Sequence, residues 1–229
     1  MKKKQLKTVQ QFYPKAQPIE QVFQKALRTA TDDLSIKPSK IVYADSFCSD
    51  EVNSIEFPWN ENFAPFRLAG LGGYPFGGLT GMGAFAAHIP TEGVAIIFYA
   101  PHIGITNEGT AGKINRSGQQ ITTGCCGSVT AALQKLLNDG IREGDFDDED
   151  YQQKKIEQLL FKEKARIQNA EQNILEAVEV VYEAIESKIG QLINKTEFPC
   201  KNVIKAGGIY INSDNNENAF WAPRAFEII

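Results

Sequence analysis

The chain has few of the residues from which metal and nucleophile sites are usually built, with only two histidines and four cysteines in 229 residues. This cysteine content excludes a disulfide-dense scaffold. A basic excess is also missing, because 28 acidic residues outnumber 24 basic ones. Proteins that bind nucleic acid by neutralising phosphates usually carry such an excess, so we expect no nucleic-acid partner.

Long hydrophobic runs are absent as well. The longest, Val94 to Ala100, is far shorter than the roughly 18–20 residues that a membrane helix needs, so we expect no membrane span. The chain starts with Met1 and three lysines, but no apolar stretch of the kind found in secretory signals follows. We therefore expect a cytoplasmic protein whose cysteines are reduced thiols.

The composition that remains is that of an ordinary globular protein, with 42% hydrophobic and 23% charged residues. The length predicts a single domain over residues 1–229. Residues 1–39 form an N-terminal segment that is helical in part, because apolar side chains recur at helical spacing from Ile19 to Ala30.

Three stretches favour β-strands. The run 93–100 is apolar throughout, which is typical of a strand buried on both faces in a parallel sheet. Residues 40–44 and 202–211 are the other two, and a short apolar run, 225–229, ends the chain. Seven glycines lie between Ala69 and Ala86 and predict tight turns or close backbone approach. Strands alternating with helices predict an α/β fold with a mostly parallel sheet.

Residues 143–195 are predicted to form an acidic loop followed by one long helix or two helices in sequence. Apolar residues form one stripe along this helical region; they are Ile167, Ile174, Val178, Val181, Ile185, Ile189 and Leu192. Such a stripe packs on the core or on a partner subunit, and its length favours the partner.

The sequence contains two functional patterns besides a possible metal site. Residues 81–86 (GMGAFA) fit a dinucleotide-binding fingerprint, but no strand precedes them, which argues against it. A cysteine nucleophile stays possible, since Cys126 at a helix start would have a stabilised thiolate and His102 would be its base.

A metal site uses the same residues together with Cys48. Cys48, His102 and Cys126 each lie at or just after the end of a predicted strand, where open α/β sheets bind ligands. Three protein ligands and one open position are what a catalytic zinc site needs, and thiolate and imidazole donors favour Zn²⁺. The alternative for each cysteine is a small buried apolar side chain, the role expected for Cys125 and Cys200.

Residues 48–53 (CSDEVN) resemble an element of the low-CO2-inducible protein B family, which is related to the theta carbonic anhydrases. The further elements that match this family in order are 69–76 (AGLGGYPF), 80–90 (TGMGAFAAHIP), 98–105 (FYAPHIGI), 112–119 (GKINRSGQ), Cys126-Gly127 and 207–212 (GGIYIN). The similarity covers roughly residues 40–229.

This resemblance implies a β-carbonic-anhydrase-like sheet flanked by helices, a Zn²⁺ ion, a homodimer, and reversible hydration of CO2 to bicarbonate. It implies Cys48, His102 and Cys126 as zinc ligands. It also implies Asp50 as the aspartate that either binds the zinc or leaves a position free for water.

The chain departs from the related enzymes in ways that bear on function. The β-class enzymes carry an arginine two residues after the aspartate, where this chain has Val52, so we take Arg116 as the candidate partner of Asp50. Ala87-His88 stands where the family often has two histidines. Some family members are not active alone, so the alternative is a non-catalytic zinc-containing subunit in inorganic-carbon handling, with Asp50 closing the metal site.

Overall fold

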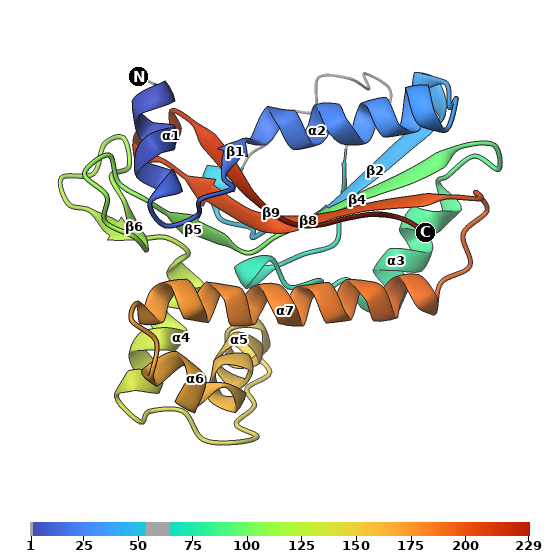
Figure 1. Ribbon diagram of the computed structural model, residues 1–229. Coiled ribbons are helices and arrows are strands. Elements are labelled where there is room, and N and C mark those ends of the chain that lie inside the picture. Colours follow the sequence, from blue (N-terminus) through green and yellow to red (C-terminus); the bar gives the residue numbers. More distant parts are fainter. Residues whose placement is uncertain (1, 54–64) are drawn as a thin grey trace.

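A central mixed sheet divides the molecule into two layers of helices in the computed structural model, which describes residues 2–53 and 65–229 (Figure 1). Its strands are β1 (Gln17–Pro18), β2 (Ile41–Ser46), β3 (Phe66–Arg67), β4 (Val94–Tyr99), β5 (His102–Gly104), β8 (Val203–Asn212) and β9 (Ala219–Ile228). The strand order is β1-β9-β8-β4-β2-β3, and β5 continues beside β8. The pairs among β2, β3, β4, β5 and β8 are parallel, whereas β9 runs antiparallel to β8 and β1. A small hairpin, β6 (Lys113–Ile114) with β7 (Thr123–Gly124), lies outside the sheet.

Strand β4 shows why the sheet forms at the centre. All six of its residues are buried, as the apolar run predicts. Because side chains alternate across a strand, Ala95, Ile97 and Tyr99 pack in one core and Val94, Ile96 and Phe98 in the other. The first core lies towards α7, and the second lies under α2.

The helices cover both faces of the sheet, with α2 on one side and α7 on the other (Figure 1). In chain order they are α1 (Lys2–Gln10), α2 (Ile19–Arg28), α3 (Gly78–Ala87), α4 (Gly127–Leu137), α5 (Tyr151–Lys162), α6 (Lys164–Gln168) and α7 (Asn173–Asn194). In the described part of the chain, no helix is long and apolar enough to cross a membrane.

The prediction of one or two helices after the acidic loop was wrong, because this region forms three, α5, α6 and α7. Helix-forming residues continue through both breaks, but propensity is a weak guide beside packing. The chain turns at Glu163 and again at 169–172, and Ile156, Leu160 and Ile167 thereby become fully buried in the core that contains α7.

The stripe on α7 is covered by the chain itself. Val178, Val181, Ile185 and Ile189 are fully buried and Leu192 nearly so, in the single chain. The length of the stripe therefore gives no argument for a partner subunit.

The glycine-rich segment contains the expected turn and one unexpected helix. Gly73 adopts a positive φ of 80°, and a Cβ there would lie 2.3 Å from the Ala100 carbonyl oxygen, so this close approach requires glycine. It ends the single turn Leu71–Gly73, from which the Gly72 N–H donates to Cys48 Sγ. Residues 78–87 form α3 despite three glycines, because Met82 and Phe85 anchor it in the core.

Candidate metal centre

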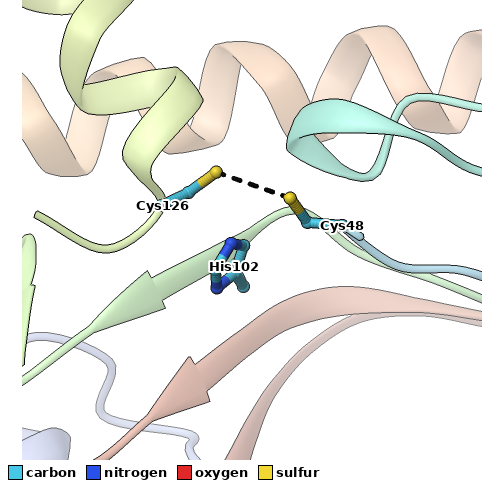
Figure 2. Close-up of side chains that lie close together, drawn as sticks. All are labelled: Cys48, His102 and Cys126. Atoms are coloured by element: carbon cyan, nitrogen blue, oxygen red, sulfur yellow. Dashed lines mark hydrogen bonds between the residues drawn. The ribbon is translucent and has the colours of Figure 1, made fainter. Parts of the chain in front are cut away.

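Three elements bring Cys48, His102 and Cys126 together at the carboxyl end of the parallel strands. Cys48 follows β2, His102 is the first residue of β5, and Cys126 is the N-cap of α4. Figure 2 shows the two sulfurs facing each other beside the imidazole ring. Their potential ligand atoms all lie within 4.8 Å of one another, and all three side chains are buried.

The distance between the two sulfurs is that expected of two thiolates bound to the same metal ion. Cys48 Sγ lies 3.7 Å from Cys126 Sγ. Two thiolates on a tetrahedral zinc, with Zn–S bonds of about 2.3 Å, lie about 3.8 Å apart. A hydrogen bond with Cys126 and burial raise the pKa of the Cys48 thiol, so its thiolate needs a cation nearby.

His102 is oriented by Asn212, the last residue of β8. Asn212 Nδ2 donates to the Val52 carbonyl oxygen at 2.9 Å, which turns its Oδ1 towards His102 Nδ1 at 2.8 Å. Nδ1 is therefore the protonated nitrogen, and Nε2 carries the free lone pair. Nε2 is buried and has no hydrogen-bond partner among the described residues, which fits a metal ligand. In metal-binding histidines, the ring nitrogen that does not bind the metal typically donates a hydrogen bond in this way.

Asp50 and Arg116 are brought together as the sequence analysis proposes. Arg116 Nη2 donates to both Asp50 carboxylate oxygens, at 3.2 and 3.0 Å, and its Nε donates to Glu51 at 2.9 Å. Burial alone would raise the pKa of Asp50, but a hydrogen bond with Glu51 and the positive charge of Arg116 lower it. Asp50 Oδ2 lies 3.8 Å from His102 Nε2, so an ionised carboxylate is close to the three potential ligands.

Other groups at the site escaped the sequence analysis. Gly72 N–H donates to Cys48 Sγ at 3.2 Å. Cys125, for which the sequence predicts only a buried apolar role, places its sulfur 3.5 Å from His102 Nδ1. Asp50, His102 and Cys125 form a second, overlapping metal-capable group. His88 is exposed at the end of α3 and belongs to neither group.

The arrangement favours a metal over the cysteine nucleophile. Nucleophilic catalysis needs one thiol beside one base, whereas here two buried sulfurs converge near one imidazole nitrogen. A cavity of about 280 Å³ adjoins the centre, and Cys48, Asp50, Glu51, Asp45 and Arg67 are among the residues that line it. The fold and the site thus define an α/β protein with a buried Cys-His-Cys centre capable of holding a metal such as zinc.

Comparison with known proteins identifies the family. A family model described as limiting CO2-inducible proteins B/C beta carbonic anhydrases matches residues 16–229, and the chain belongs to this family. The match begins before residue 40, so it includes α2. No curated protein is significantly similar to the chain.

Solved structures agree with the family assignment. The crystal structure of PtLCIB4, described as a homolog of the limiting CO2-inducible protein LCIB, is 28% identical, with a TM-score of 0.83 over 97% of this chain and 94% of that one. A mutant of PtLCIB4 gives 27% identity and a TM-score of 0.84 over 98% and 94%. LCIB itself, at 22% identity, has a TM-score of 0.71 over 95% and 92% and shows the common fold. The predicted β-carbonic-anhydrase-like fold is confirmed.

Proposed function

We propose that the protein is a zinc-dependent carbonic anhydrase that converts CO2 and water reversibly into bicarbonate. The observation that carries the proposal is the buried centre of Cys48, His102 and Cys126, in which the imidazole Nε2 has no hydrogen-bond partner among the described residues. In this proposal these three residues bind Zn²⁺. A zinc ion bound there supplies hydroxide at neutral pH by lowering the pKa of its water.

Arg116 and Asp50 prepare the site for this reaction. The two hydrogen bonds from Arg116 occupy both Asp50 oxygens and hold the carboxylate in place beside the three ligands. Asp50 Oδ2 is then an acceptor for the proton of the attacking oxygen. CO2 is small and apolar, and the 280 Å³ cavity beside Cys48 has ample room for it.

A second candidate function is a zinc-containing subunit without catalytic activity, in which Asp50 occupies the fourth metal position. The 3.8 Å between Asp50 Oδ2 and His102 Nε2 favours this alternative, because a small movement would bring the carboxylate to the metal. Homodimer formation and a cytoplasmic location stay predictions.

Stopped-flow CO2 hydration with protein of known zinc content distinguishes the two functions. We expect hydration by the wild type and a loss of about 100-fold or more in Asp50→Asn, since general acid–base groups contribute roughly 10²–10⁴-fold. Zinc content should stay unchanged in this variant because the three ligands remain. Arg116→Ala should lose activity similarly, whereas Arg142→Ala removes an exposed arginine and should not.

The possible results distinguish the enzyme from the non-catalytic subunit. Wild-type rates in Asp50→Asn would remove Asp50 from the mechanism. Fully zinc-loaded wild-type protein without hydration at any pH would contradict the enzyme and support the non-catalytic subunit.

A further inference from the structure

A second, larger cavity lies beside α5 and α7, and none of its lining residues belongs to the candidate metal centre. Its volume is about 690 Å³, within the roughly 300–1,000 Å³ typical of small-molecule sites. Residues of α5, of the segment just before α3 and of the loop 143–146 line it, together with Lys188 of α7.

Lysines without counter-ions distinguish this cavity. Lys155, Lys162 and Lys188 line it, and no ion pair involves any of them in the described part of the chain. Burial and then the charges of Lys162 and Lys188 lower the pKa of Lys155, so the three ammonium groups repel one another across the cavity.

The positive charge is local. A fourth lining lysine, Lys154, is already paired with Asp145 and Glu157. Of the acidic residues, only Asp145 and Glu143 line the cavity. Four lysines against the two lining carboxylates leave an excess of two positive charges, in a chain whose net charge is −4. An unbalanced cationic cavity in an acidic protein points to an anionic ligand.

Aromatic rings also line the cavity. The ring centroids of Tyr74 and Phe76 are 5.1 Å apart, and those of Phe76 and Tyr151 are 5.7 Å apart. Lys155 Nζ lies 5.2 Å from the Tyr74 centroid, so charge and ring surface adjoin. Tyr151 is 46% exposed and leaves part of its ring surface available for stacking.

We propose that this cavity binds a small organic phosphate carrying an aromatic ring, which is the chemistry of a nucleotide. The three unpaired lysines bind the phosphates, as lysine does in many phosphate sites, and the rings of Tyr74 and Tyr151 contact the base. Gly78, the first residue of α3, also lines the cavity, and the positive end of that ten-residue helix adds to the attraction. An acidic peptide would match the charge, but a concave site of this volume with ring surfaces favours the small molecule.

Calorimetric titration of the full chain tests both halves of the proposal with three probes: ATP, tripolyphosphate without a ring, and adenosine without phosphate. We expect ATP to bind most tightly. Lys155→Gln, Lys162→Gln and Lys188→Gln should each weaken ATP binding roughly tenfold, as expected for one charge-assisted contact. Tyr151→Ala should weaken ATP but leave tripolyphosphate unchanged.

Two controls make the result specific. Lys201→Gln makes the same charge change at an exposed lysine outside the cavity and should bind ATP as the wild type does. Cys48→Ser should also bind ATP normally, which excludes chelation of the proposed zinc by the nucleotide and keeps this test independent of the proposed function.

Absence of ATP binding at millimolar concentration and physiological ionic strength would overturn the proposal. So would equal weakening in Lys201→Gln and the three cavity variants. Tripolyphosphate binding as tight as that of ATP, unaffected by Tyr151→Ala, would reduce the site to a plain anion site and contradict the nucleotide.

Discussion

Cys48 and Cys200 are both buried thiols, yet their surroundings differ. Cys48 faces a second sulfur and a backbone N–H, whereas the Cys200 thiol donates to the Asn202 carbonyl oxygen at 3.2 Å. Purified protein should contain about one zinc per chain, as in catalytic zinc sites. Elemental analysis should show most of it lost in Cys48→Ser and His102→Ala and kept in Cys200→Ser. Full occupancy in both of the first two variants would refute the ligand assignment.

Asp45 gives a pH-dependent term in stability. Burial raises the pKa of this carboxyl to about 6, although Arg67 and a backbone hydrogen bond lower it. The unfolded chain has an aspartate pKa near 3.9, so the native state holds the proton to higher pH. Its contribution to the free energy of unfolding is therefore fully present below the unfolded-state pKa of about 3.9 and is lost as the pH rises through about 6.

Asp45→Asn should remove this term, because asparagine resembles the protonated carboxyl. The variant should match the wild type at about pH 3, below the unfolded-state pKa, and exceed it at about pH 7, by up to about 3 kcal/mol on the conversion of pKa shift to free energy. Urea denaturation at the two pH values measures the difference in free energy of unfolding between the two proteins. The contributions of the other carboxylates cancel because both proteins contain them. A gap between the two proteins that is equal at both pH values would contradict the raised pKa.

At the site, residue types and spacing could select three potential ligands, whose assignment stays a prediction, but not the groups that orient them. Cys48, His102 and Cys126 were predicted from their positions after strands. Asn212 is 110 residues from His102, and its role depends on the parallel register of β5 with β8, which pairs His102 with Tyr210. Gly72 acts through a backbone N–H, which no residue type reveals.

Among elements, β5 shows how closely the site depends on backbone packing. A Cβ on Gly104 would lie 2.3 Å from Ile114, 2.7 Å from the Lys113 carbonyl oxygen and 2.9 Å from Cys125. Gly104→Ala should therefore push the β6–β7 hairpin and Cys125 away, costing roughly 1–3 kcal/mol as overpacking does, and should weaken zinc binding.

The matched control is Gly83→Ala in α3, where an added Cβ meets nothing within 4 Å. Alanine is the better helix former, so this variant should gain up to about 1 kcal/mol. Urea denaturation compares the two. Equal stability of Gly104→Ala and the wild type would show that the hairpin moves freely over β5.

Elements could be predicted where the local sequence pattern and the packing in the folded protein agree. The apolar run that became β4 is unambiguous, because a strand buried on both faces leaves no polar alternation. The α3 helix was missed because its glycines oppose helix formation locally, while the buried side chains of Met82 and Phe85 favour it only in the folded protein. The run 225–229 covers only the end of β9, because Pro223 and Arg224 separate it from the apolar residues 219–222 of the same strand.

For the whole molecule, the uncovered edge of strand β9 favours a homodimer. Strand β9 pairs with β8 along its length, but its other side meets β1 only at Phe220 and Trp221. In the described part of the chain, residues 222–228 thus have a strand on one side alone, and Ile228 is 47% exposed. An uncovered strand edge with apolar side chains is a template for pairing with another chain.

We therefore expect sedimentation at micromolar concentration to give about twice the 25.4 kDa chain mass. Ile228→Glu should shift the protein towards monomer, because a carboxylate buried in the joint sheet would lose its hydration. Leu137→Glu places the same charge on a similarly exposed side chain at the end of α4 and should leave the dimer intact. A 25 kDa wild-type species would contradict the dimer, whereas a dimer that survives Ile228→Glu would move the interface away from β9.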